Sequence, residues 1–461
     1  MGVSWPPWAR GDGLEAFAIP VEEKFVIYRP LLPLAFVGNR AMAELTLELA
    51  RREPVSAEGV PEQVAAFLRA VGFLRPDPPP PAPPDPAYRP STAVLLLTNR
   101  CNLRCTYCYA DGGKGPAEDL PMAVAQAVID QAHRHAREKG AAQFELTFHG
   151  GGEPVQAWGA LRAATAYARS KSLPCEVTLV SNGVWTARQR EWILDNLDGV
   201  TISCDGTQAT QDRQRPLASG RGSFRAVMRT IQALDRAHLD YGIRLTATAP
   251  WQGRLAEDVR FICEETGCPA MQVEPAFNTR RGEHQVPGDE QALAFAEAFL
   301  EAFEVAGEAG RSLTYSGARP WLLTQAFCTA PYQALVANAA GNLVACYEVA
   351  AEDHSLAGLS SLGRVAAGEV RIDDQARRAF LAYLDERRAG CRGCFCRWHC
   401  AGDCYARTAS RQREKPWKAS PRCRMNREIT ARLLLWYIMA GDGVWRGQGA
   451  NAHQARLLRA F

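Results

Sequence analysis

The chain has 461 residues, 47% of them hydrophobic and 22% charged, with a formal net charge of +3. This is an ordinary globular composition with room for two or three domains, and it gives no electrostatic indication of nucleic-acid binding. Residues 1–13 lack the apolar core of a secretion signal, and the apolar run 433–440 is far too short to span a membrane. We therefore expect a cytoplasmic protein, in which the large number of cysteines, 15 in all, indicates metal or redox chemistry rather than a disulfide framework.

The N-terminal part of the chain predicts a short arm followed by a small domain. Residues 1–20 carry little pattern and are expected to form the arm. Two strand-like runs, 25–28 and 34–37, then precede two amphipathic helical stretches, the second of them at 61–71. Residues 21–75 thereby resemble the winged-helix-like domain found on enzymes that modify ribosomally made peptides. The resemblance implies that an extended leader peptide adds a strand to the sheet; a domain that only packs against the rest of the chain is the alternative.

Residues 76–91 are rich in proline and predict an extended linker between two domains. From 92 to 310, strands alternate with helices, and repeated βα units predict a parallel sheet with right-handed crossovers. The expected fold class is α/β, a partial (β/α)6 barrel with functional residues at the carboxyl ends of its strands. The six predicted strands are 93–97, 144–148, 176–180, 200–203, 243–248 and 271–274.

Three cysteines follow the first of these strands in the spacing Cys101-x3-Cys105-x2-Cys108. Thiolates are suited to iron–sulfur clusters or to zinc, but three of them cannot close a tetrahedral zinc site. They can hold a [4Fe–4S] cluster and leave one iron open for a ligand. With Tyr107 before the last cysteine, the spacing resembles the radical SAM superfamily. The resemblance implies that the open iron binds S-adenosylmethionine (SAM), whose one-electron cleavage gives a 5′-deoxyadenosyl radical.

Later motifs in the same segment strengthen this resemblance. The run 149–154 contains a Gly-Gly-Glu pattern, although Gly150 is one glycine more than the commonest form and leaves the register open. By resemblance, the glutamate and its glycines contact the methionyl amino group, and Arg215 pairs with the SAM carboxylate. A solvated surface pair of Asp205 with Arg215 is the alternative. The resemblance assigns these residues to the SAM pocket: Tyr107, Gly151, Gly152, Glu153, Asn182, Ser203, Asp205 and Arg215.

Residues 311–425 contain eight further cysteines; seven of them stand in an order typical of a cluster-binding domain, and four of these alone would suit a zinc ribbon. The full order resembles the SPASM extension of radical SAM enzymes, which implies two auxiliary [4Fe–4S] clusters beside the SAM-binding one. The proximal auxiliary cluster is then one ligand short: Cys396 or another cysteine supplies it, a non-cysteine residue does, or the iron is open to a substrate thiolate. By resemblance, the distal ligands are Cys391, Cys394, Cys400 and Cys423, and the proximal ligands are Cys328, Cys346 and Cys404.

The last segment, residues 426–461, predicts a C-terminal helix and a weakly ordered tail beyond Gly441. The helix is expected at 427–440, and its apolar side chains should pack on the barrel or on a partner. The four remaining cysteines in the barrel segment are interpreted as buried thiols without a metal role. They are Cys175, Cys204, Cys263 and Cys268.

Together these resemblances imply an enzyme, a radical SAM oxidoreductase of the SPASM subfamily. We expect it to abstract hydrogen from a ribosomally synthesised peptide and to form an intramolecular cross-link. The expected partners are a precursor peptide and an electron donor such as flavodoxin or ferredoxin. Two alternatives stay open: a formylglycine-forming enzyme similar to sulfatase maturases, and a non-catalytic peptide-binding scaffold with structural metal clusters. No base is singled out; the candidate catalytic residues are Glu274, Tyr347 and Glu348.

Overall fold

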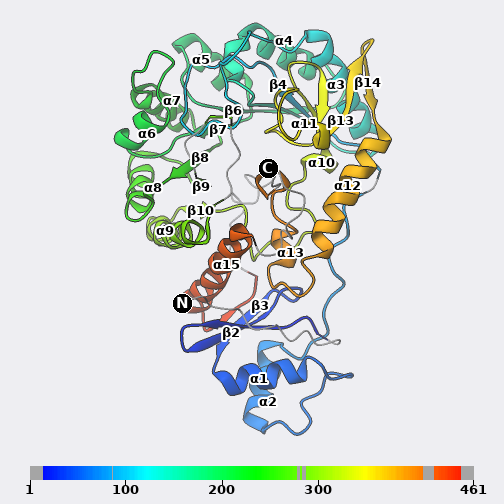
Figure 1. The fold of residues 1–461 in the computed structure, drawn as a ribbon, viewed down its shortest axis with the longest axis vertical. Helices are drawn as coiled ribbons and strands as arrows, with labels where there is room; N and C mark the ends of the chain where they lie inside the picture. Colours follow the sequence, from blue (N-terminus) through cyan, green and yellow to red (C-terminus); the bar gives the residue numbers. More distant parts are fainter. Residues whose placement is uncertain (1–13, 86, 278–280, 283–286, 409–419, 448–461) are drawn as a thin grey trace.

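The computed structural model describes residues 14–85, 87–277, 281–282, 287–408 and 420–447. Most of the expected arm (1–13) and most of the expected tail (448–461) lie outside these ranges. The described part contains a four-stranded sheet and an 11-stranded sheet. Figure 1 shows the small sheet and its two helices at the bottom, with the large curved sheet above them.

The small sheet begins with three antiparallel strands: β1 (Phe17–Val21), β2 (Lys24–Arg29) and β3 (Leu34–Gly38). Two helices follow, α1 (Arg40–Leu49) and α2 (Glu62–Val71), and pack on one face of the sheet. The prediction of a loose arm is wrong from Phe17 onward, because Phe17 and Ile19 are buried in β1. The sequence pattern did not indicate this strand because it contains Pro20, and proline within a sheet is tolerated only on edge strands.

The large sheet contains all six strands that the barrel segment predicts, in the predicted order and with every neighbouring pair parallel. Helices connect them on the outer side of the curve (Figure 1) and bury a shared apolar core between sheet and helices. The strands are β4 (Thr92–Leu96), β5 (Phe144–His149), β6 (Cys175–Ser181), β7 (Gly199–Ser203), β8 (Tyr241–Thr248) and β9 (Ala270–Ala276). The main helices are α3 (Met122–Glu138), α4 (Trp158–Arg169), α5 (Ala187–Asn196), α6 (Gln208–Gln214), α7 (Phe224–Ala237), α8 (Arg254–Glu265) and α9 (Asp289–Glu308).

Five short strands from the C-terminal segment extend this sheet at both ends. β10 (Ser312–Thr314) lies parallel to β9, and β11 (Ala334–Ala337) lies parallel to β4. β12 (Asn342–Val344), β13 (Ser361–Ala366) and β14 (Glu369–Ile372) continue from β11 as antiparallel neighbours. The strand prediction missed four of these elements because three or four residues are too few to show a pattern, and it also missed β13, which has six residues. The predicted boundary at 310/311 therefore does not interrupt the sheet.

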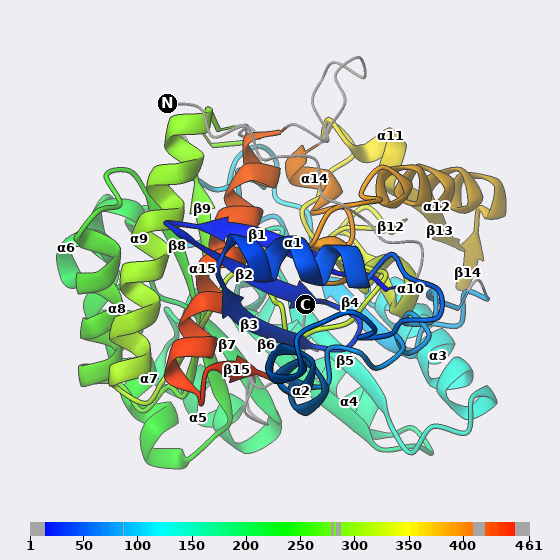
Figure 2. The same cartoon turned by 90° about the horizontal axis from the view of Figure 1, so that it is seen from below.

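The end of the described chain returns to the small sheet. α12 (Asp374–Ala389), α13 (Arg397–Cys400) and α14 (Tyr405–Thr408) lead to the long helix α15 (Pro421–Ala440). α15 packs against α9, where Trp436 meets Phe303 with ring centroids 5.1 Å apart, and against the small sheet (Figure 2). The chain then forms β15 (Val444–Trp445), which pairs with β3, so the expected disorder after Gly441 does not begin there. The remaining short helices are η1 (Pro154–Ala157), α10 (Ala330–Gln333) and α11 (Ala357–Ser360).

None of the helices in the described ranges is both long and apolar enough to cross a bilayer.

Candidate active site

The strands of the large sheet lead at their carboxyl ends into a cavity of about 350 Å³. Parallel α/β sheets place functional side chains at this edge, because the loops that follow the strands converge there. The cavity brings together most of the residues that the sequence predicts, including all three candidate catalytic residues. They are Cys101, Cys105, Tyr107, Cys108, Gly151, Gly152, Glu153, Asn182, Ser203, Arg215, Glu274, Cys328, Cys346, Tyr347, Glu348 and Cys404.

The loop after β4 presents the first three cysteines. The backbone N–H of Leu103 donates to Cys101 Sγ at 3.5 Å, and the N–H of Gly112 donates to Cys108 Sγ at 3.4 Å. Such N–H···S contacts favour the thiolate form that a metal needs. Burial raises the pKa of Cys101 to about 12 and that of Cys105 to about 11, so without a metal these thiols keep their protons. A positive metal centre removes that obstacle, because it takes the place of the proton.

The glycines after β5 are required by the contact with this loop. A Cβ on Gly152 would lie 2.1 Å from the carbonyl oxygen of Arg100, and Gly151 has a φ of +97°. Backbone hydrogen bonds fix the same contact, with Gly152 N–H donating to Thr98 O at 2.7 Å. The Gly-Gly-Glu pattern thus holds the cysteine loop against the sheet; its contact with a methionyl amino group stays a prediction.

Glu153 is a buried carboxylate that positions the next loop. Its Oε1 accepts from the Ser181 hydroxyl at 2.6 Å, and its Oε2 accepts from the Asn182 N–H at 2.8 Å. Burial raises the pKa of Glu153 to about 6. Asn182 in turn donates through Nδ2 to Asn102 Oδ1 at 2.8 Å, which ties the turn after β6 to the cysteine loop. Glu153 therefore connects three loops at the floor of the cavity.

Tyr107, Asp205 and Arg215 form a chain of polar contacts. The Tyr107 hydroxyl donates to Asp205 Oδ2 at 2.6 Å and accepts from Arg215 Nη1 at 2.6 Å. Asp205 and Arg215 are buried, so the alternative of a solvated surface pair is wrong. Asp205 stands behind the other two and is not part of the cavity lining. The buried Arg215 Nε has no hydrogen-bond partner within the described residues.

These features fit an iron–sulfur cluster with SAM. The cysteine loop supplies three thiols at the cavity, two of which already receive N–H donors. Arg215 supplies a guanidinium at the same wall, and a guanidinium with an unused nitrogen suits a carboxylate. The residues present therefore match the group that the sequence implies.

Family and structure comparisons agree with this geometry. Residues 95–248 match the model of the radical SAM superfamily. These residues are a radical SAM domain. Its boundaries run from β4 to the end of β8, and they contain the whole predicted SAM pocket.

The curated relatives match only part of this chain. The chain is 32% identical over 163 residues to the sporulation killing factor maturation protein SkfB of Bacillus subtilis (strain 168), covering 35% of this chain and 36% of SkfB. It is 29% identical over 153 residues to the serine-type anaerobic sulfatase-maturating enzyme of Klebsiella aerogenes, covering 31% of this chain and 36% of that enzyme. The chain thus spans only about a third of the length of these two relatives.

A solved structure extends the likeness in fold beyond the radical SAM domain. The structure described as native anSMEcpe with bound AdoMet and Cp18Cys peptide aligns with a TM-score of 0.57. The alignment covers 76% of this chain and 99% of that chain, at 16% sequence identity. At this identity the comparison shows the fold alone: an α/β radical SAM fold with a mostly parallel central sheet.

A second group of thiols lines the same cavity. Cys328, Cys346 and Cys404 come from three separate segments, and Cys346 and Cys404 pack in one apolar cluster beside β11 and β12. The Glu348 N–H donates to Cys346 Sγ at 3.4 Å. The predicted proximal ligands therefore share the cavity with the predicted SAM cluster, and Glu348 adjoins them.

The candidate catalytic residues are held in contacts that do not suit a base. Arg407 pairs with Glu274 and, with Nε 3.4 Å from Oε1, with Glu348. Burial alone would raise the pKa of Glu274, but the charge of Arg407 and its other contacts hold it below its ordinary value. Burial raises the pKa of Tyr347, which stacks on His149 with centroids 4.7 Å apart. Glu274 is thus an ion-pair partner and Tyr347 stays protonated, so a base remains unassigned.

The four predicted distal ligands lie away from the cavity. Cys394 and Cys400 pack with β1 and β2 in an apolar cluster, and Cys423 lies in the first turn of α15. Asn426 Nδ2 donates to Cys400 Sγ at 3.4 Å. Cys396 belongs to this same cluster, not to the one that contains Cys346 and Cys404. Its placement argues against the option that Cys396 completes the proximal set.

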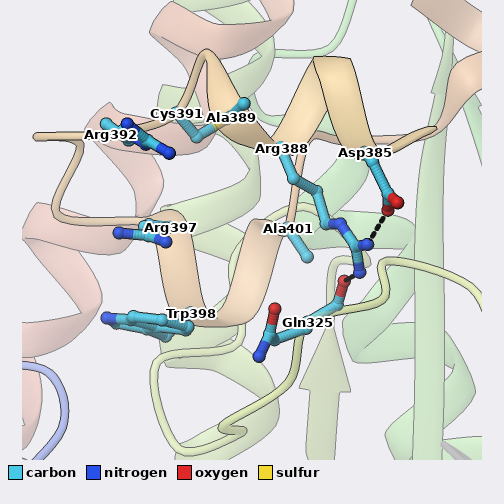
Figure 3. A pocket seen from close by; sticks show the side chains of 9 residues that line it. All are labelled: Gln325, Asp385, Arg388, Ala389, Cys391, Arg392, Arg397, Trp398 and Ala401. Carbon is cyan, nitrogen blue, oxygen red and sulfur yellow. Dashed lines mark hydrogen bonds and ion pairs between the residues drawn. The ribbon is translucent and has the colours of Figure 1, made fainter. Parts of the chain in front are cut away.

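A surface pocket of about 180 Å³ adjoins Cys391, the remaining distal thiol (Figure 3). Arg388, Arg392 and Arg397 line it, and the guanidinium of Arg397 lies 4.3 Å from the ring centroid of Trp398. Only Asp385 among the lining residues carries a negative charge, and it pairs with Arg388. The surface next to the distal thiols is therefore positively charged.

Within the described ranges, no group of three His, Cys, Asp or Glu side chains forms a site for a single metal ion. The cluster ligands therefore stay predictions.

Sequence reasoning missed several residues of the cavity wall. His149 accepts from the Gly150 N–H through Nδ1 at 2.7 Å, and burial lowers its pKa to about 3, so it is neutral. Arg244, Arg407 and Arg422 are also on this wall. An isolated arginine gives no functional signal in a single sequence. His149 differs, because it stands directly before the glycine motif, and this position was the one sequence feature that could have identified it.

Proposed function

We propose that this radical SAM enzyme matures a ribosomally synthesised peptide by forming an intramolecular cross-link. The observation that carries the proposal is the shared cavity: two groups of three thiols, Cys101/Cys105/Cys108 and Cys328/Cys346/Cys404, line one space of about 350 Å³. A substrate segment in that space lies within reach of both groups. This arrangement suits a reaction that removes a hydrogen atom at one side and an electron at the other.

The first group of thiols would hold the SAM-binding [4Fe–4S] cluster, with Arg215 at the SAM carboxylate. When bound, the cluster and SAM supply a radical strong enough to abstract hydrogen from an unactivated C–H bond. The protein's own residues hold this group in place: Tyr107 fixes the guanidinium of Arg215, and Glu153 fixes the turn at Asn182.

The C-terminal thiols would hold two auxiliary [4Fe–4S] clusters. Cys328, Cys346 and Cys404 form the proximal set in this proposal, and the distal set is Cys391, Cys394, Cys400 and Cys423. Abstraction would remove one hydrogen atom from the substrate, and the substrate radical would then give one electron to these clusters and lose one proton, so two hydrogens leave the substrate in total. An electron-transfer partner such as flavodoxin or ferredoxin, in the cytoplasm, completes the cycle.

A peptide is the proposed substrate class for two reasons. SkfB is named as a maturation protein for the sporulation killing factor, and the aligned anSMEcpe structure was determined with a bound peptide. The small sheet also lies beside the enzyme's main body, and an extended peptide can bind to a sheet of this kind by adding a strand through its backbone. The type of cross-link, whether thioether, carbon–carbon or ether, is left to experiment.

A second candidate function is formylglycine formation on a protein substrate. The identity to the Klebsiella aerogenes sulfatase-maturating enzyme and the fold likeness to anSMEcpe favour it. Both candidates act on a polypeptide, but only the first has a use for a leader-binding sheet.

The test is tandem mass spectrometry of a peptide encoded beside the gene, co-expressed with the enzyme at low oxygen. Loss of two hydrogens, with no fragment ions between two residues, supports the cross-linking function. Loss of two hydrogens with a hydrazine-reactive aldehyde supports the formylglycine function. An unchanged peptide together with active SAM cleavage rejects the substrate class. A colourless zinc protein that leaves SAM intact would overturn the enzymatic reading and favour the scaffold.

A further inference from the structure

The small sheet is completed by a strand from the far end of the chain. β15 pairs antiparallel with β3, with Val444 opposite Phe36 and Trp445 opposite Ala35. The Trp445 side chain is only 1% exposed and packs among Tyr28, with centroids 6.2 Å apart, and Tyr437, at 6.4 Å. A strand that lies more than 400 residues later in the sequence thus occupies one edge of the sheet.

The other edge, β1, is a poor place for an added strand. Pro20 has no N–H and cannot donate to a neighbouring strand. The start of β1 is also fastened to other parts of the protein. The Glu15 N–H donates to Asp77 Oδ2 at 2.6 Å, and Trp398 Nε1 donates to Glu15 Oε2 at 2.9 Å. Phe17 packs on Phe395 in the same region.

The β3 edge, by contrast, has the properties of a strand-binding site. It accepts an antiparallel strand and provides a buried pocket for one large side chain, as Trp445 demonstrates. β15 contains only two residues and lies between Gly443 and Gly447, which both have positive φ angles. It covers Ala35 and Phe36 but not the rest of β3, where Val37 and Gly38 are partly exposed.

We propose that β15 occupies the place at which the leader peptide adds its strand, and that it competes with the leader for the β3 edge. The inference rests on the proposed function, since it needs a substrate with a leader. The leader would be an extended segment with one bulky apolar residue, which takes the pocket of Trp445. Because β15 is tethered, its effective concentration at the edge is high, and the leader must outcompete it. Leader affinity is then set partly by the enzyme's own C-terminus.

The test measures binding of a fluorescently labelled synthetic leader, from the neighbouring precursor peptide, by fluorescence anisotropy. Two variants weaken β15 differently: Val444→Pro removes a backbone donor, and Trp445→Ala empties the pocket. Both are expected to bind the leader about tenfold more tightly than the wild type. Asp442→Ala, a change at an exposed residue before the strand, is the matched control and should leave the affinity unchanged. Thermal melting of each variant checks that the fold is retained.

The outcomes separate this inference from the proposed function. Equal affinity of all four proteins would overturn the inference and leave leader binding intact, with the leader bound elsewhere. Failure of every protein to bind would reject leader recognition itself, and the inference with it. Hydrogen exchange gives a second readout in the wild type: on addition of leader, exchange at Val444 and Trp445 should become faster while Ala35 and Phe36 stay protected. Unchanged exchange at Val444 and Trp445 would contradict displacement.

Discussion

The two groups of thiols on the cavity are built in different ways. Cys101, Cys105 and Cys108 lie within eight residues on one loop, and backbone N–H groups of that loop and its continuation donate to two of the sulfurs. Cys328, Cys346 and Cys404 come from segments up to 76 residues apart, brought together beside β11, β12 and α14. The first site depends on local backbone geometry, whereas the second depends on the completed sheet.

This difference predicts that the two groups fail separately. A change in the first should remove SAM chemistry and leave the second intact. A change in the second group should leave SAM cleavage intact and abolish modification of the peptide. The variants below are ordered by the size of the expected effect.

The largest effect is expected for Cys105→Ser. The variant should lose SAM cleavage completely, because two remaining thiolates cannot hold the cluster, and it should keep the iron of the proposed auxiliary clusters. Iron determination and chromatographic detection of 5′-deoxyadenosine measure both results. Retained cleavage would show that Cys105 is not a ligand.

Cys346→Ser tests the other group. We expect SAM cleavage to continue at about the wild-type rate, while modification of the peptide disappears. Cys263→Ser, which changes a cysteine in the core away from the cavity, is the matched control and should keep both activities. Loss of SAM cleavage in Cys346→Ser would contradict the independence of the two groups.

Arg215→Ala should weaken SAM binding by about 3 kcal/mol, or roughly 100-fold, because a buried charged hydrogen bond is lost. Tyr107→Phe should have a smaller effect of about 1 kcal/mol, since Arg215 stays but loses the hydroxyl that orients it. Equilibrium dialysis with labelled SAM measures both dissociation constants. If Tyr107→Phe costs as much as Arg215→Ala, the tyrosine has a role beyond positioning.

Gly152→Ala should destabilise the protein by about 3 kcal/mol, because the new methyl group meets the backbone carbonyl of Arg100, which cannot rotate away. Gly159→Ala is the control: it lies in α4 with no atom within 4 Å of the added Cβ, and it should stabilise the helix by about 0.5–1 kcal/mol. Chemical denaturation measures both. A neutral Gly152→Ala would mean that the cysteine loop can move.

An effect smaller than those of Arg215→Ala and Gly152→Ala concerns pH. Because the folded pKa of Glu153 is raised from 4.5 to about 6, the folded state binds more protons than the unfolded state between these values. The free energy of unfolding should therefore fall by about 2 kcal/mol as the pH rises through this window, and stay lower above it. The free energy of unfolding of the Glu153→Gln variant should not show this decrease. Urea denaturation of both proteins from pH 4.5 to pH 7.5 gives the comparison, and parallel curves would count against it.

The sequence predicts the first thiol site and the six central strands well, because both depend on short-range patterns. Cys101, Cys105 and Cys108 show their spacing directly, and each of the six strands contains closely spaced apolar residues that are visible in the sequence. The elements that were missed depend on distant parts of the chain. β11 is only four residues long and is a strand because β4 lies beside it, and β15 exists only because β3 offers an open edge. The role of Arg407, which joins Glu274 to Glu348, is visible only when three segments meet.

The pairing of β15 with β3 also affects how a deletion experiment is interpreted. Removing residues 1–75 would take away the leader-binding candidate, but it would also expose the face of α15 that carries Leu434 and Ile438. Loss of turnover in such a protein would report damage to the fold as well as loss of leader recognition. Point changes at the β3 edge avoid this ambiguity.

The same strand pairing has a consequence for synthesis on the ribosome. β3 emerges early, but its partner strand is made about 400 residues later, which takes roughly 20 to 80 seconds at ordinary rates of translation. During that time the β3 edge and the apolar face beneath it have no partner from their own chain. An open strand edge of this kind favours association with other nascent chains. The cell's chaperones, and the time at which β15 leaves the ribosome, should therefore influence how much active enzyme is obtained.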